Sequence, residues 1–132
     1  MGVSIYAKNK KCPIEFDMGY GSFLSLRKFI GEELAGQAYL NWLKTDDSTP
    51  KDKLHRICEL FHAFVGDATY NFLTQSDCDG ELSYKECKEV LTNIKDLTND
   101  DTYGYIYCQH SFEDFKELLQ YCYSHRTKLM WS

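Results

Sequence analysis

Residues 75–86 read QSDCDGELSYKE, and this stretch decides how the middle of the chain is expected to fold. In the twelve-position numbering of an EF-hand loop, Asp77 and Asp79 occupy ligand positions 3 and 5, and Glu86 occupies the bidentate position 12. Position 1 departs from the pattern, because Gln75 stands where such a loop has Asp. A loop of this kind joins two helices, so the stretch predicts one helix before it and another after it.

The spacing makes this loop a candidate calcium site. The predicted ligands are the side-chain carboxylates of Asp77, Asp79 and Glu86 and the backbone carbonyl of Glu81. Because Gln75 offers only a neutral oxygen, calcium binding is expected to be weak, with a dissociation constant of roughly 10⁻⁴ M or higher. A metal-free corner is the competing interpretation, since Ser83 and Glu86 have the spacing of a capping box at the start of the next helix.

The helix before this loop has the clearest apolar stripe in the chain. It is expected to begin at Pro50, which suits the first turn of a helix, and to end near residue 73 or 74. Its inward positions recur at helical spacing: Leu54, Ile57, Cys58, Phe61, Val65, Ala68 and Phe72. The helix after the loop is expected to begin at Ser83.

Two more helices are predicted on either side of this central pair. The first covers residues 23–44, where Gly31 and Gly36 weaken a helix and suggest that another element packs closely there. The second begins at Ser111, which is placed to cap a helix near the C-terminus.

Strand signals occupy the two ends of the chain and one segment between helices. Alternating residues predict a hairpin of strands at 3–7 and 14–18, and β-rich composition predicts strands at 103–108 and 128–131. The predicted fold class is therefore α+β, with about four helices packed on a small antiparallel sheet formed by both termini and residues 103–108. A length of 132 residues predicts a single domain, residues 1–132.

The chain is acidic, and the acidity is concentrated in its middle. The formal net charge is −5 overall, but residues 57–101 alone carry ten acidic and three basic groups, a net of −7. Because this segment repels a phosphate backbone, direct nucleic-acid binding is not expected. Basic groups near the N-terminus, in the turn at residues 8–11 and at Arg27 and Lys28, form a small patch that solubility alone explains.

The cysteines and the lengths of the apolar runs indicate where in the cell the protein is expected. The chain has six cysteines but does not open with a secretory signal peptide, so we interpret them as free thiols in a reducing cytoplasm. The longest apolar runs fall short of the 18 residues that a membrane helix needs, so no membrane span is expected.

Histidines and cysteines at helical spacing raise a zinc hypothesis. His55, Cys58 and His62 lie at positions i, i+3 and i+7 of one predicted helix, and Cys122 and His125 lie three apart on another. If Cys58, His62, Cys122 and His125 converge, they form a Cys₂His₂ site. Spacing alone leaves this open, because the edge of any amphipathic helix gives the same recurrence.

Catalytic motifs are missing from the sequence. It contains no G-x-S-x-G, phosphate-binding loop, dinucleotide-binding fingerprint or H-E-x-x-H. The prediction is a non-enzymatic protein. A thiol-dependent or hydrolytic enzyme is an alternative that requires an unusually reactive cysteine.

Two segments carry a resemblance to known proteins: residues 16–23 (FDMGYGSF) followed by Leu26 and Arg27, and residues 76–81 (SDCDGE) followed by Glu86 and Cys87. Through them the chain resembles small uncharacterised proteins carried by phages and mobile elements of Gram-positive bacteria. The resemblance implies a cytoplasmic accessory protein that modulates or inhibits a host factor by stoichiometric binding. A host protein is thus the expected partner, and a divalent-cation module built on the 75–86 loop is the alternative function.

Overall fold

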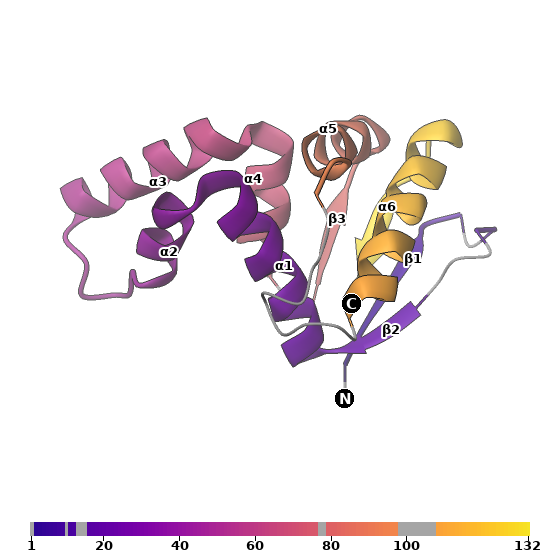
Figure 1. The fold of residues 1–132 in the computed structure, drawn as a ribbon, viewed down its shortest axis with the longest axis horizontal. Coiled ribbons are helices and arrows are strands. Elements are labelled where there is room, and N and C mark those ends of the chain that lie inside the picture. The colour runs from indigo at the N-terminus through magenta and orange to yellow at the C-terminus, as the bar shows by residue number, and fades with distance from the viewer. Residues whose placement is uncertain (1, 10, 13–15, 77–78, 98–107) are drawn as a thin grey trace.

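The computed structural model describes residues 2–9, 11–12, 16–76, 79–97 and 108–132. Within these residues the chain forms six helices and four strands, so the α+β class is confirmed (Figure 1). The prediction of about four helices is wrong, because two of the predicted helices are each divided at a glycine.

The first division falls at Gly36, between α1 (Tyr20–Ala35) and α2 (Gln37–Leu43). Gly36 has φ 54°, in the left-handed region where residues with a β-carbon are strained. The break lets α2 turn back along α1, so that the ring of Tyr39 lies directly against Gly31. A β-carbon at Gly31 would overlap that ring, which confirms the close packing expected at this glycine.

The second division falls at Gly66, between α3 (Lys51–Val65) and α4 (Asp67–Thr74). Gly66 has φ 81° and ψ 170°, a combination essentially restricted to glycine. The predicted apolar stripe continues from one helix to the other, with Val65 and Ala68 both buried. We call this corner, centred on Gly66, the α3–α4 elbow.

The remaining helices begin close to their predicted starts. α5 (Tyr84–Ile94) follows Ser83, whose side chain caps it as expected, and α6 (Cys108–Ser124) begins three residues before the predicted Ser111. Among the described residues, no helix has both the length and the apolar character that crossing a membrane requires.

The four strands form one antiparallel sheet in the order β2-β1-β4-β3. Their bounds are Gly2–Ala7 for β1, Phe16–Gly19 for β2, Gly80–Leu82 for β3 and Leu129–Trp131 for β4. The predicted N-terminal hairpin is confirmed by the pairing of β1 with β2, and the predicted C-terminal strand by the pairing of β4 with β1.

The predicted strand over 103–108 falls almost entirely outside the described residues. Residues 103–107 lie outside the described residues, and Cys108 is the first residue of α6. In the described part, the sheet contains a strand that was not predicted, β3, which lies inside the 75–86 loop. It pairs with β4, with Leu82 opposite Leu129. β3 escaped prediction because alternation of apolar and polar residues carries no signal over only three residues.

The core lies between the sheet and the helices, with Phe72 at its centre. The Phe72 ring centroid is 6.2 Å from that of Phe23 and 5.1 Å from that of Phe115. It is 5.4 Å from the ring of Trp131, the last residue of β4. All four side chains are almost completely buried, so this aromatic cluster joins α1, α4 and α6 to the sheet.

Helices α2 and α3 project away from the sheet, as Figure 1 shows, and we call them the helical arm. The arm packs around Phe61, whose ring centroid lies 5.4 Å from Tyr39 and 5.3 Å from both Trp42 and Tyr70. Phe61 and Tyr39 are buried, so the arm has a core of its own that continues into α4.

Candidate functional site

The 75–86 loop is closed by a pair of hydrogen bonds between Gln75 and Glu81. The Gln75 side-chain amide donates to the backbone carbonyl of Glu81 at 2.8 Å, and the Glu81 backbone N–H donates to the Gln75 amide oxygen at 3.0 Å. The carbonyl predicted to bind calcium therefore already has a donor. The Glu81 carboxylate lies 3.2 Å from the ammonium of Lys128.

Glu86, the predicted bidentate ligand, also has partners for both carboxylate oxygens. Its Oε1 accepts from the backbone N–H of Ser83 at 3.1 Å, while the backbone N–H of Glu86 donates to Ser83 Oγ at 3.2 Å. These two bonds confirm the predicted capping box. Its Oε2 accepts from the side-chain amide of Asn71 on α4 at 2.7 Å.

The other two predicted ligands do not complete a site in the described residues. Asp77 lies outside them, and Asp79 is exposed. Nowhere in the described ranges do three or more histidine, cysteine or acidic side chains gather as they would around a metal ion. Calcium binding by Asp77, Asp79, Glu81 and Glu86 thus stays a prediction, which now has to compete with hydrogen bonds inside the loop.

The four residues of the zinc hypothesis are not brought together. On the arm, His62 bonds the Asp67 carboxylate at 2.5 Å and stacks on the ring of Tyr70 with centroids 4.4 Å apart. On α6, His125 stacks on Tyr121, with the ring centroids 3.9 Å apart. Each histidine is thus engaged locally, on separate parts of the molecule.

The two cysteines of the zinc and enzyme hypotheses have structural partners as well. Cys122 is buried and hydrogen-bonds with Cys87 of α5, and this bond together with burial raises the pKa of the Cys87 thiol well above its usual range. Cys58 is half-buried beside Tyr70, where burial and the bond to this thiol raise the pKa of Tyr70. Cys12, Cys58, Cys87 and Cys122 are free thiols.

Arg27 does not belong to the surface basic patch in which the sequence placed it. It is only 6% exposed, and its guanidinium donates to the carbonyls of Phe72 at 2.9 Å and Gln75 at 2.6 Å. The same group lies 5.3 Å from the ring centroid of Phe23 and 5.7 Å from that of Phe72. A cation suits this position because the C-terminus of α4 presents unpaired carbonyls with negative partial charge.

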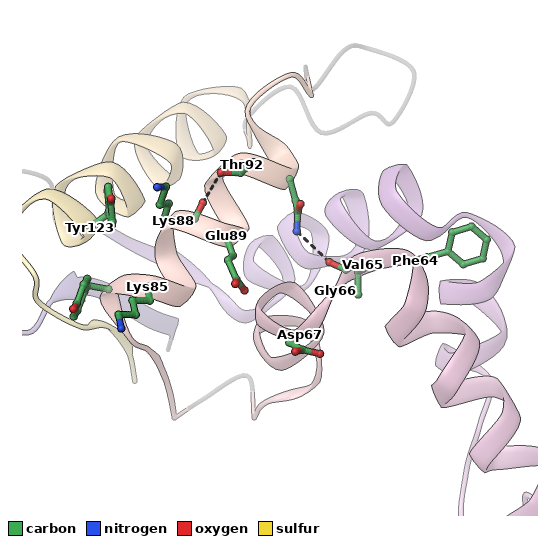
Figure 2. A pocket seen from close by; sticks show the side chains of 11 residues that line it. Phe64, Val65, Gly66, Asp67, Lys85, Lys88, Glu89, Thr92 and Tyr123 are labelled. Atoms are coloured by element: carbon green, nitrogen blue, oxygen red, sulfur yellow. Dashed lines mark hydrogen bonds between the residues drawn. The ribbon is translucent and has the colours of Figure 1, made fainter.

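A groove of about 770 Å³ lies between the α3–α4 elbow and α5 (Figure 2). The elbow forms one wall, with the exposed ring of Phe64 at its end. Helix α5 forms the other wall, and α6 contributes Tyr123. The remaining lining side chains come from α5 and the start of α4: Asp67, Tyr84, Lys85, Lys88, Glu89, Thr92 and Asn93.

Charges of opposite sign occupy different parts of this groove. Figure 2 shows Lys85, Lys88 and Tyr123 at one end, and Asp67 and Glu89 between them and the far end. The ammonium of Lys88 lies 5.0 Å from the ring centroid of Tyr123, within reach of a cation–π interaction. The groove therefore has a basic, aromatic end and an acidic middle.

A hydrogen-bonded clamp fixes the two walls of the groove. The side-chain amide of Asn93 on α5 donates to the carbonyl of Val65 at 3.1 Å, a bond drawn in Figure 2. The same amide donates to the hydroxyl of Thr69 at 2.9 Å, on the other side of the elbow. The carbonyl of Val65 is free to accept because α3 ends there, at Gly66. These bonds to Val65 and Thr69 hold α5 at a fixed position against the elbow, and the shape of the groove follows from that position.

Sequence reasoning did not find this groove. Its residues are spread over three helices whose relative placement depends on the elbow, and the predicted helix runs straight through Gly66. One signal was available: Leu60 and Phe64 are large apolar residues outside the inward stripe of α3, one turn apart, and both are more than half exposed.

Searches against protein-family models, curated proteins and solved structures return no match to this chain.

Proposed function

We propose that the protein is a small non-enzymatic binding protein that modulates a host macromolecule by stoichiometric contact. The observation that carries the proposal is the groove between the α3–α4 elbow and α5, with aromatic rings at both ends and separated charges between them. The phage or mobile-element setting and the cytoplasmic location belong to the proposal through the sequence resemblance.

The lining of the groove suits a segment of a partner protein. Tyrosine and phenylalanine supply large contact areas at little cost in side-chain entropy, which is why aromatic residues concentrate at protein interfaces. Separated charges orient a bound segment and select against segments with the opposite pattern. We expect a segment with an acidic residue at the Lys85–Lys88 end and a basic residue opposite Asp67 and Glu89.

Binding is favoured over thiol chemistry by the burial of Cys87 and Cys122. The hydrogen bond with Cys87 lowers the pKa of the Cys122 thiol, but this thiol is completely buried. A reactive cysteine needs a stabilised thiolate and access to solvent. Cys87 has neither, because it is completely buried and its pKa is raised by Cys122 and by burial.

The proposal is tested by capture from a lysate of a Gram-positive host, with retained proteins quantified by mass spectrometry. The groove variant Lys85→Glu/Lys88→Glu reverses the basic end. The matched control, Lys8→Glu/Lys11→Glu, makes the same change in charge at exposed lysines next to β1, away from the groove. We expect a partner that the wild type and the control retain and that the groove variant loses about tenfold or more.

Two results would contradict the proposal. One is that the groove variant retains every captured protein as well as the control does. The other is that the folded wild-type protein retains no more host proteins than a sample of the same protein that was denatured before it was coupled to the resin. Thermal melting of both variants shows beforehand that each is folded.

A further inference from the structure

The helical arm has a concave surface of its own, separate from the groove beside the elbow. We infer that this surface binds a small organic phosphate, namely a phosphate monoester whose organic group is apolar. The inference goes beyond the proposed function and does not depend on it. It follows from the charges, the hydrogen-bond donors and the apolar side chains that line two connected hollows between α2 and α3.

The two hollows are neighbours, because both are lined by Asn41, Lys53 and Ile57. The first, which we call the polar hollow, has a volume of about 350 Å³ and is completed by Lys44, Thr45 and Thr49. The second, which we call the apolar hollow, has a volume of about 230 Å³ and is completed by Ala38, Arg56 and Leu60. Together they fall within the range of roughly 300–1,000 Å³ that is typical of small-molecule pockets.

Every charged side chain that lines these hollows is basic: Lys44, Lys53 and Arg56. All three are exposed, and within the described part of the chain none of them forms an ion pair. Three cations around one concave surface create a positive potential that attracts an anion. The groove beside the elbow differs in this respect, because Asp67 and Glu89 line it together with its lysines.

The acidic residues of the same segment do not neutralise these cations. Asp46, Asp47 and Asp52 line neither hollow. The carboxylate of Asp46 accepts from the backbone N–H of Ser48 at 2.8 Å and from the Ser48 hydroxyl at 2.5 Å. Asp52 directly precedes Lys53 on α3, and adjacent residues of a helix do not face each other.

The neutral polar groups of the polar hollow present hydrogens to a ligand. The side-chain amide of Gln37 donates to the amide oxygen of Asn41 at 2.8 Å, which leaves the NH₂ group of Asn41 as its available end. The backbone N–H of Asp46 donates to Thr49 Oγ1 at 3.0 Å, which leaves the hydroxyl hydrogen of Thr49 available. Cations and donors together suit a phosphate monoester, which has three acceptor oxygens and about −1.5 to −2 charges at neutral pH.

The apolar hollow determines what is attached to the phosphate. Its apolar wall consists of Ala38, which is buried, Ile57, which is half-buried, and Leu60, which is 53% exposed. A phosphate held by Lys53 at the boundary of the two hollows leaves room for its organic group against this wall, where burial of apolar surface is favourable. Arg56 adds a guanidinium that stacks well on an aromatic ring. The expected ligand is therefore an apolar or aromatic ester rather than inorganic phosphate.

The affinity is expected to be moderate. Because the three cations are exposed, salt screens part of their attraction for the phosphate. For a small ester at physiological salt we expect a dissociation constant on the order of 10⁻⁴ M.

Isothermal titration calorimetry with phenyl phosphate tests the inference. The wild type should bind this ester about tenfold more tightly than inorganic phosphate, because only the ester has a ring for the apolar hollow. Lys44→Gln/Lys53→Gln removes two of the cations and should weaken binding about tenfold or more. The matched control, Lys8→Gln/Lys11→Gln, removes the same charge at exposed lysines next to β1 and should bind as the wild type does.

Asn41 separates hydrogen bonding from overall charge. Asn41→Ala removes the NH₂ donor without changing the net charge and should weaken binding of phenyl phosphate about threefold to tenfold. Asn41→Asp keeps the size of the side chain but places an anion against the phosphate, and should abolish binding. Asn41 is exposed, so both variants are expected to fold, and thermal melting checks this.

A second arm of the experiment identifies the source of the monoester. Phosphatidic acid carries the same phosphate monoester on a lipid, so vesicles of phosphatidylcholine and phosphatidic acid in equal amounts are sedimented with the protein. Given binding of phenyl phosphate, co-sedimentation that Lys44→Gln/Lys53→Gln loses supports a lipid as the ligand. Absence of co-sedimentation supports a free metabolite.

Two results would overturn the inference. One is that phenyl phosphate gives no saturable heat with the wild type at millimolar concentration. The other is that Lys44→Gln/Lys53→Gln binds it as tightly as Lys8→Gln/Lys11→Gln does. Equal affinities for phenyl phosphate and inorganic phosphate would overturn the role assigned to the apolar hollow.

Discussion

Arg27 shows how one side chain can join two helices and a loop. It starts on α1 and donates to two carbonyls at the end of α4, and its guanidinium also lies 5.3 Å from the ring centroid of Phe23 and 5.7 Å from that of Phe72. The sequence placed this residue on the surface, since an Arg-Lys pair in an amphipathic helix is usually exposed. Its burial could not be predicted without knowing that the end of α4 lies against α1.

Replacing Arg27 should therefore be costly. Arg27→Met keeps much of the side-chain length but leaves the carbonyls of Phe72 and Gln75 without their donor, and we expect a loss of about 3 kcal/mol in the free energy of unfolding. Urea denaturation followed by circular dichroism measures this. Lys28→Met is the control, because Lys28 forms only a partly exposed pair with Glu32 at 3.8 Å, and it should change stability by less than about 0.5 kcal/mol. Equal losses in the two variants would contradict the role assigned to Arg27.

Gln75 is the residue at which the calcium prediction can be tested. Gln75→Asp supplies the missing anion at position 1 and removes the amide that donates to the Glu81 carbonyl. Calcium affinity should then rise about tenfold or more above that of the wild type, because ligand charge sets the affinity of such loops. Isothermal titration calorimetry measures the change, with Asp79→Ala added to Gln75→Asp as the control that should abolish it. A flat titration of the Gln75→Asp variant at millimolar calcium would exclude the loop as a calcium site.

At the scale of elements, the positions of helices and terminal strands could be predicted, but the breaks within helices could not. The apolar stripe that defines α3 and α4 continues through Gly66, and a glycine inside a helix is tolerated at a cost of about 1 kcal/mol. Nothing in the local pattern therefore separates a glycine that bends the chain from one that does not. Gly31 illustrates the second case, since it stays helical and makes room for Tyr39.

Gly66→Ala tests the elbow. The nearest atom to an added β-carbon is the Asn93 amide nitrogen at 4.0 Å, so the cost comes from the backbone rather than from a clash. We expect a loss of about 1–3 kcal/mol in unfolding free energy, measured by urea denaturation, because φ 81° with ψ 170° is essentially a glycine conformation. A semisynthetic protein with D-alanine at position 66 should keep the stability of the wild type. An L-alanine variant as stable as the wild type would show that the elbow is not strained.

The docking of α2 on α1 should depend on pH through Tyr39. Burial, partly opposed by the charge of Arg27, raises the pKa of Tyr39 to about 12 from its ordinary value of 10.0. The unfolded chain thus loses this proton first, so the stabilising contribution is complete below pH 10 and declines as the pH rises to about 12. Denaturation at several pH values should show a loss of up to about 2 kcal/mol over this window that is missing in Tyr39→Phe. If the unfolding free energies of the wild type and Tyr39→Phe fall equally over this pH range, the loss of stability comes from other titratable groups.

At the scale of the whole molecule, Trp131 connects the sheet, the core and the 75–86 loop. Its ring packs on Phe72 and covers Gly80, and its indole N–H donates to the carbonyl of Ser76 at 2.9 Å. The terminal strand was predictable from its apolar residues. The pairing of this strand with β3 was not predictable, because β3 has only three residues and so shows no pattern of alternating apolar and polar residues.

Truncating this side chain should loosen the loop as well as the core. Trp131→Ala should lower the free energy of unfolding by about 3–5 kcal/mol. Trp131→Phe keeps most of the packing but loses the bond to Ser76, and should cost about 1–2 kcal/mol. Thermal and urea melts give the totals, and amide hydrogen exchange at Glu81 should speed up in both variants. Unchanged exchange at Glu81 would show that the Trp131 side chain does not hold the loop in place.

The pairing of β1 with β4 also determines how the molecule responds to a mechanical load. Because these neighbouring strands are antiparallel, Ser4 and Ser132 lie side by side and exchange backbone hydrogen bonds of 2.9 and 3.1 Å. A force that pulls the two ends apart acts along these bonds, which run across the strands, and so it opens the ladder one rung at a time instead of shearing all rungs together. The two central strands of the sheet, β1 and β4, are therefore expected to separate at low force when Ser4 and Ser132 are pulled apart, and this separation divides the sheet into two halves.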